Sequence, residues 1–265
     1  MPDHESKDAF NPPEPNTTES IVQESINFAF VGFKRWDALH FIDIAKNGYV
    51  FEHSAAFFPL YPLTIRYVTI YIFQSETVHL LAAILLNFIF FNISAIFLFK
   101  LTVILFKERN IAILTVLAFC LNPANVFFSA AYTESMYFML TMIGLFFLFS
   151  KNFFKSLVPF SLACLCRSNG IVNFGYLAYL LLQETKKVTV KSLSCLVFKF
   201  VISLASILSG FLAYQYYIYS ILCIDNSMPA ASHELQDYAH NNGYKLVANF
   251  KLENWCLKAL PLSYR

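Results

Sequence analysis

Charged side chains are scarce in this sequence: they make up 14% of its 265 residues, whereas hydrophobic residues make up 57%. With 30 Phe and a mean hydropathy of +0.54, the chain has more apolar surface than the core of a soluble protein could bury. Basic residues form no run interleaved with aromatic residues, and the formal net charge is only +2, so nothing indicates nucleic-acid binding. The composition predicts a membrane protein.

The first twenty residues contain no apolar core, which excludes a secretory signal there and predicts that the chain starts in water. They contain the sequon Asn16-Thr17-Thr18, which is either a lumenal glycosylation site or a chance match in a polar stretch.

The sequence has no cluster of residues with the spacing of metal ligands, so we expect no metal site. Four cysteines lie in apolar runs, where such thiols pack as small hydrophobic residues: Cys120, Cys164, Cys166 and Cys195. Cys223 and Cys256 instead flank one polar segment, and they form either a disulfide facing an oxidising lumen or two free thiols.

Membrane-spanning helices need about 20 mainly apolar residues. Candidate segments lie at 78–99, 110–128, 134–150 and 194–223. Two further apolar regions do not fit as simple spans. Residues 55–73 contain two prolines and an arginine, and residues 156–182 are interrupted at 167–170 by the polar run RSNG. The sequence therefore predicts an all-α polytopic membrane protein with two irregular regions.

Basic residues indicate the topology, because cytosolic loops are enriched in Lys and Arg. They follow the first span, the third span and the interrupted region, whereas SAAYTES after the second span contains none. These loops all face the cytosol only if 55–73 lies along the membrane surface and 156–182 enters and returns as two half-helices. We therefore predict a first lumenal loop with juxtamembrane helices at 1–77, a transmembrane bundle at 78–224 and a second lumenal loop at 225–265.

A polar group lies in the predicted first lumenal loop. Trp36-Asp37 opens a segment with helical periodicity that Gly48 is expected to end, and His40 lies one turn from Asp37 on the same face. Asp37 is either an N-terminal cap or an active-site acid, and Trp36 is either an interfacial anchor or a platform for a sugar. We treat His40 as a candidate substrate contact.

Arg167 would lie near the membrane midplane, where a cation normally faces a cavity and has a partner. It directly precedes Ser168-Asn169, which would open the second half-helix, so these residues predict an anion site that a phosphate fits. The alternatives are an ion pair with Glu134 or a side chain that extends to the surface. Glu134 itself either favours the dipole at the start of a helix or is a lumenal carboxylate facing the same cavity as Asp37.

Four stretches of the chain resemble a known family. They are RWDALHFIDIAKNGYVFEHSAAFFPLYPL, LNPANVFFSAAYTES, CRSNG and WCLKALPLSY, and in order and spacing they are similar to the GPI mannosyltransferase 2 family of PIG-V type. Leu60 stands where this family is expected to have Gly. The family also begins with a helix before this loop and continues with further spans, so the resemblance implies a fragment or short isoform, truncated at both ends.

The resemblance implies a GT-C type helical bundle in the endoplasmic reticulum membrane that adds the second, α1,6-linked mannose to the GPI anchor precursor. The implied donor is dolichyl-phosphate mannose and the acceptor is the mannosyl GPI precursor. Trp36 and Asp37 carry over as the functional pair, with Asp37 as the acid. No tightly bound cofactor is expected, a divalent ion stays open, and a small membrane accessory subunit is a candidate partner.

Two other functions are compatible with parts of the pattern. A non-catalytic truncated isoform or assembly subunit would fit the missing ends. A polytopic transporter would also use broken helices, but it predicts an inverted repeat and a mid-membrane ion site, and the sequence has neither.

Overall fold

The computed structural model describes residues 10, 12–13, 21–72, 75–185, 190–224 and 232–247. Within these ranges the chain forms helices joined by turns, and the only β pairing is one isolated antiparallel bridge between Phe51 and Leu246. The all-α class expected from the sequence is confirmed for the described residues.

The chain divides into two compact units, each of which is described by itself. The first unit comprises Met1–Ile84, Ala130–Tyr132 and Tyr214–Arg265. The second unit comprises Leu85–Ser129 and Thr133–Ala213.

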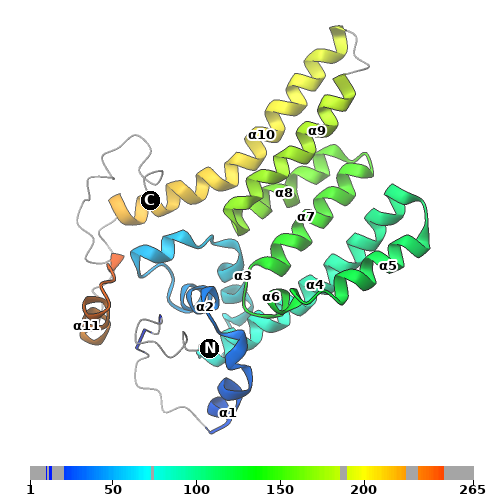
Figure 1. Ribbon diagram of the computed structural model, residues 1–265. Coiled ribbons are helices and arrows are strands. Elements are labelled where there is room, and N and C mark those ends of the chain that lie inside the picture. The colour runs from blue at the N-terminus through cyan, green and yellow to red at the C-terminus, as the bar shows by residue number, and fades with distance from the viewer. Residues whose placement is uncertain are drawn as a thin grey trace. The chain divides into compact units, whose positions relative to one another are not determined.

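The described part of the first unit contains several short helices (Figure 1). They are α1 (Ile21–Phe30), η2 (Val31–Phe33), α2 (Asp37–Asn47), η3 (Glu52–Ala56), α3 (Leu60–Thr69) and α11 (His233–Asn241). Apolar residues recur at helical spacing along the buried face of α2. Gly48, with φ of +81°, ends the helix, and its N–H donates to the Ile44 carbonyl at 2.9 Å. α2 packs against α3, where the Phe41 ring meets the Tyr61 ring edge-on at 5.5 Å.

Residues 232–247 pack onto the loop after α2. Phe10, Phe51, Ala239 and Leu246 form a buried cluster. The Glu52 N–H donates to the Lys245 carbonyl, and the Val247 N–H donates to the Val50 carbonyl, both at 2.9 Å. Residues almost 200 positions apart in the sequence therefore share one small core.

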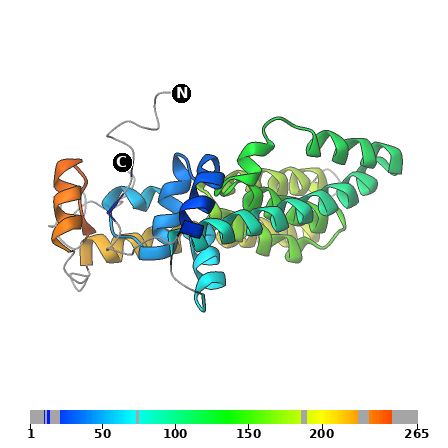
Figure 2. The ribbon, with the colours of Figure 1, turned by 90° about the horizontal axis from the view of Figure 1, so that it is seen from below.

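The second unit is a bundle of longer apolar helices. It contains α5 (Arg109–Cys120), α6 (Asn125–Ser129), α7 (Glu134–Phe149), α8 (Phe153–Cys166), η4 (Ser168–Asn173) and α9 (Phe174–Thr185), with most of α4 (Glu76–Phe106) and α10 (Val190–Tyr219). α4 and α5 lie side by side (Figure 2), with the Phe91 and Phe119 rings stacked at 4.6 Å. α8 and α10 are joined by Ser161, whose hydroxyl lies 2.7 Å from that of Ser206.

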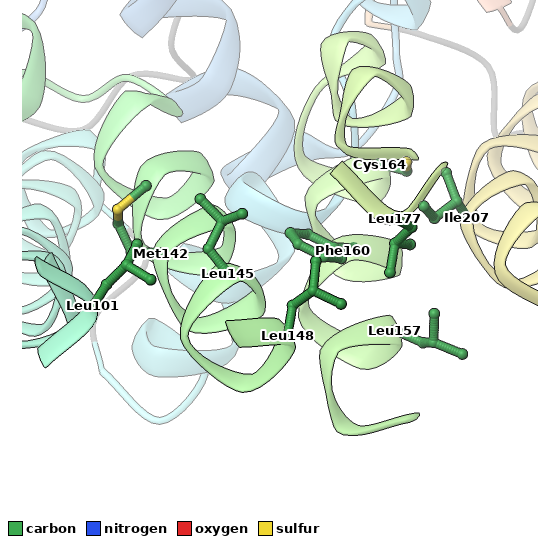
Figure 3. Packing of buried hydrophobic residues seen from close by; sticks show 9 residues of the cluster. All are labelled: Leu101, Met142, Leu145, Leu148, Leu157, Phe160, Cys164, Leu177 and Ile207. Atoms are coloured by element: carbon green, nitrogen blue, oxygen red, sulfur yellow. The ribbon is translucent and has the colours of Figure 1, made fainter. Parts of the chain in front are cut away.

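Five helices contribute to the core of the second unit (Figure 3). Its buried members are Leu101, Met142, Leu145, Leu148, Leu157, Phe160, Cys164, Leu177 and Ile207. The Phe160 ring lies directly against Gly144 of α7, where a Cβ atom would come within 2.4 Å of the ring. A glycine at this position therefore allows α7 and α8 to approach closely.

Two helices of the described chain are long and apolar enough to cross a membrane, by length and composition: Glu76–Phe106 and Leu193–Ile224. Only 28% and 22% of their most apolar windows are buried, whereas the core helix of a soluble protein would be mostly buried. Neither helix lies near the start of the chain. The exposed apolar surface of both helices fits a lipid environment.

The region expected to be one span at 110–128 is divided. α5 ends at Cys120 after 12 residues, and α6 begins at Asn125. Pro123 lies between them; it lacks an N–H donor and disfavours helical backbone in the residue before it, so the helix cannot continue.

The interrupted region at 156–182 forms α8, the 3₁₀ segment η4 and α9. α8 ends at Cys166, and Arg167 has extended backbone with φ of −153°. Gly170 then packs against the last turn of α8, where a Cβ atom would lie 2.4 Å from the Cys164 nitrogen. The glycine of CRSNG is therefore required for the chain to fold back on α8.

The proline-led region at 55–73 contains α3, a helix of 10 residues. At 1.5 Å per residue this is about half the thickness of a bilayer core. Tyr61 and Ile65 are buried, whereas Tyr67 and Tyr71 are 77% and 96% exposed. α3 is therefore too short to cross a membrane, and exposed tyrosines lie in its last turn and just beyond its end.

Candidate functional site

The turn at Trp36-Asp37 is the most unusual backbone feature of the first unit. Trp36 precedes α2 with φ of +48° and ψ of −122°, a conformation that side chains other than glycine rarely adopt. Its indole is 61% exposed. Asp37 is the first residue of α2 and is also exposed, so Trp36 and not Asp37 occupies the cap position. An acid here interacts favourably with the positive end of the helix dipole.

Three tethers hold the residues that precede this turn. The Phe33 carbonyl accepts the Ala131 N–H at 3.3 Å, and the Arg35 carbonyl accepts the Tyr132 hydroxyl at 2.9 Å. Lys34, between them, forms an ion pair with Glu76 in the first turn of α4. The exposed turn therefore follows three residues whose positions are restrained by long-range contacts.

His40 lies one turn into α2, in an aromatic cluster. Its ring stacks between the rings of Phe10 and Phe57, at centroid distances of 4.3 and 4.6 Å, and His53 meets it edge-on at 5.2 Å. Burial, together with the smaller effect of the neighbouring His53, lowers the pKa of His40 to about 4. His40 is therefore a neutral ring within a packed cluster at neutral pH; its expected contact with substrate stays a prediction.

Asp43 is an acid that sequence reasoning did not single out. It is 7% exposed; its Oδ1 accepts the Asn47 amide at 2.8 Å, and its Oδ2 has no hydrogen-bond partner in the described structure. Burial raises the pKa of Asp43 to about 6, and the Asn47 hydrogen bond and Lys46 only partly oppose this. The signal in the sequence was an acid between Ile42 and Ile44, at a position on the apolar face of α2.

Glu134 and Arg167 form an ion pair in the second unit. Glu134 opens α7 and Arg167 follows α8, and the two side chains are 31% and 36% exposed. The sequence left two partners open for Arg167, a bound phosphate or the Glu134 carboxylate. In this structure the guanidinium is paired with Glu134. Ser168 and Asn169 follow at the start of η4 and are exposed, and the Asn169 carbonyl accepts the Tyr137 hydroxyl at 3.3 Å.

The predicted site residues therefore fall into two groups. Trp36, Asp37 and His40 lie at the start of α2 in the first unit, and Glu134 and Arg167 lie at the junction of α7 and α8 in the second. No group of three or more His, Cys, Asp or Glu side chains suited to a metal ion occurs in the described ranges.

Comparison with known proteins assigns the chain to a family. The family model described as mannosyltransferase (PIG-V) matches residues 1–265. The chain belongs to the PIG-V mannosyltransferase family. The resemblance seen in the sequence is confirmed.

Several curated members of the PIG-V family are similar to the whole chain. It is 33% identical to the GPI alpha-1,6-mannosyltransferase 2 of Rattus norvegicus over 279 residues, which cover 100% of this chain and 55% of the rat protein. It is 30% identical to the GPI mannosyltransferase 2 of Drosophila melanogaster, with 100% of this chain and 62% of the fly protein covered. It is also 30% identical to the GPI alpha-1,6-mannosyltransferase 2 of Homo sapiens, with 100% and 55% covered. The chain spans roughly 55–62% of the length of these relatives, and no solved structure matches it.

The sequence offered two candidate modification sites, a disulfide between Cys223 and Cys256 and a glycosylation site at Asn16. Cys223 is disulfide-bonded. Cys256 lies outside the described residues, so the pairing of these two cysteines stays a prediction. Asn16, the candidate glycosylation site, also lies outside them.

Proposed function

We propose that this chain transfers the second, α1,6-linked mannose from dolichyl-phosphate mannose to the mannosyl GPI precursor in the endoplasmic reticulum membrane. The observation that carries the proposal is the match of the family model to residues 1–265, together with full-chain similarity to relatives named GPI alpha-1,6-mannosyltransferase 2. The lipid substrates are the proposed partners, and a small accessory subunit stays a prediction.

Asp37 is the proposed catalytic acid-base residue. The mannose C1–O bond to dolichyl phosphate breaks, and the acceptor hydroxyl forms a new bond to C1 from the opposite face. The hydroxyl proton moves to the Asp37 carboxylate, and the electron pair leaves with the phosphate. The exposed position of Asp37 at the start of α2 supports this role because a large lipid-linked acceptor can reach it. The exposed Trp36 indole is suited to stack on a sugar ring.

Arg167 is the proposed ligand of the donor phosphate. A guanidinium has five N–H donors, and the Glu134 ion pair uses those of Nη1, which leaves donors for a phosphate oxygen. With Ser168 and Asn169 exposed beside it, the arrangement would stabilise the charge that grows on the departing phosphate. Because a phosphate leaves as a stable anion, the proposal requires no tightly bound cofactor.

The proposed membrane arrangement is multi-pass. The two long apolar helices span the bilayer, and the shorter helices α5, α7 and α8 complete a GT-C type bundle. α3 lies along the lumenal surface, which its length, its exposed Tyr67 and the exposed Tyr71 just beyond it favour. The first loop, with Asp37, then faces the lumen.

Complementation tests the proposed function. Cells that lack the second GPI mannosyltransferase are transfected with the 265-residue chain, with Asp37→Asn and with Asp43→Asn, and surface GPI-anchored protein is measured by flow cytometry. We expect rescue by the wild-type chain and by Asp43→Asn, which changes an acid of the same helix that is buried. We expect at least a roughly 100-fold loss of transfer for Asp37→Asn in microsomes, the lower end of the range of about 10²–10⁴ for a general acid-base residue.

Two results would count against the proposal. Rescue by Asp37→Asn at the wild-type level would remove Asp37 from the chemistry. Failure of a wild-type chain that is expressed and inserted would favour a non-catalytic assembly role instead.

A further inference from the structure

The backbone at Trp36 needs an external constraint. A residue other than glycine with φ of +48° and ψ of −122° has a strained backbone. Such a residue keeps this conformation only when contacts with the surrounding structure hold it there. Hydrogen bonds within the turn include Ala38 N–H to the Arg35 carbonyl at 3.1 Å and Leu39 N–H to the Trp36 carbonyl at 3.2 Å. The first of these bonds ends on the Arg35 carbonyl, which therefore accepts both from the start of α2 and from Tyr132.

The segment Ala130–Tyr132 supplies the long-range constraint. Its Ala131 N–H and Tyr132 hydroxyl bond the carbonyls of Phe33 and Arg35, so two alternate residues are held from a segment about 97 positions away. Tyr132 is 8% exposed and Ala131 is fully buried, which limits the access of competing water to these bonds. The Tyr132 bond ends on the residue directly before Trp36.

We infer that Tyr132 is a positioning residue for the Trp36-Asp37 turn, whose buried hydroxyl holds the Arg35 carbonyl and thereby sets the direction of the Asp37 carboxylate. The inference rests on the proposed function, in which Asp37 receives the acceptor proton. Proton transfer requires the acid within hydrogen-bond reach of the reacting hydroxyl, and displacements of about 1 Å can reduce rates 100-fold. Tyr132 itself touches neither substrate.

The structure offers a matched control. Tyr214 is 2% exposed, and its hydroxyl lies 3.0 and 2.7 Å from the carbonyls of Ala55 and Phe57. It is also a buried tyrosine that binds backbone carbonyls in the same unit, but its bonds end on η3 and on the residue that follows it. Tyr132→Phe and Tyr214→Phe each remove one hydroxyl and keep the ring, so they differ in which loop loses its tether.

The first measurement follows the mobility of Trp36. The chain has two tryptophans, so a Trp255→Phe background leaves Trp36 as the only indole. We expect time-resolved fluorescence anisotropy of the purified chain in detergent to show a larger nanosecond component for Tyr132→Phe than for wild type, with Tyr214→Phe unchanged. Equal mobility of Trp36 in all three proteins would overturn the inference.

The second measurement is mannose transfer in microsomes without the Trp255 substitution. We expect Tyr132→Phe to lower kcat about 10-fold, with KM for dolichyl-phosphate mannose unchanged, because alignment and not donor binding is lost. A kcat equal to that of Tyr214→Phe would overturn the inference even if Trp36 became mobile. If wild type transfers no mannose, the proposed function fails, whereas the anisotropy comparison still decides whether the hydroxyl holds the turn.

Discussion

Asp43→Asn is expected to stabilise the protein at neutral pH and to destabilise it slightly in acid. Asp43 is 7% exposed, and one of its oxygens has no hydrogen-bond partner in the described structure. Burial raises the pKa of its carboxyl from 3.8 to about 6. The folded protein therefore binds a proton at Asp43 more tightly than the unfolded chain does, and stability falls as pH rises through this window.

The magnitude follows from the two pKa values. At about 1.4 kcal/mol for each tenfold difference in proton affinity, the ionised Asp43 destabilises the folded state by about 3 kcal/mol above pH 6. An asparagine keeps the acceptor for Asn47, but its amide nitrogen lies where Oδ2 has no partner, which costs about 1 kcal/mol. We expect a net gain of about 2 kcal/mol at neutral pH, or a Tm higher by about 4–8 °C.

Thermal unfolding of the chain in detergent, followed by circular dichroism across about pH 4 to 8, measures this effect. Asp237→Asn is the control, because Asp237 is an exposed helical aspartate. The difference between Asp43→Asn and wild type should grow from about pH 4 to about pH 6 and then level off. A difference that is independent of pH, or a lower Tm for Asp43→Asn at neutral pH, would refute the reasoning.

Two further predictions address packing and topology. Gly170→Ala should destabilise the protein by roughly 2 kcal/mol or more, because its Cβ would lie 2.4 Å from backbone of α8, whereas Gly175→Ala, with nothing within 4 Å, should be tolerated; equal melting temperatures would contradict the close approach. With single cysteines at Asp37 and Lys187 in sealed microsomes, an impermeant thiol reagent should label residue 187 directly and residue 37 only after the vesicles are opened; labelling of both from one side would contradict the proposed topology.

Much of the fold followed from local pattern. The periodicity after Trp36 predicted α2, and Gly48 ends it as expected. The polar run RSNG predicted the interruption after α8, since a cation and a glycine in sequence do not continue an apolar helix. At 110–128 the apolar composition suggested one span, but the backbone limits of Pro123 decided the division into α5 and α6.

The candidate site was less predictable than the fold. Trp36 and Asp37 were found because their residue types are unusual in so apolar a chain, but the strained backbone at Trp36 could not be inferred from its neighbours. The aromatic stack on His40 depends on Phe10 and Phe57. The partner of Arg167 had two alternatives in the sequence, and side-chain geometry selected Glu134 for the structure described.

The sequence by itself determined the helical class, the lipid environment and the family, because hydrophobicity, turn residues and motifs can be read from the local order of residues. Only the tertiary structure decided which groups restrain one another: the Tyr132 hydroxyl on the Arg35 carbonyl, Glu134 on Arg167, and an Asp43 carboxyl buried with one oxygen unpaired. These contacts join residues far apart in the chain or depend on the depth of burial, and neither distance nor burial is encoded by any single stretch.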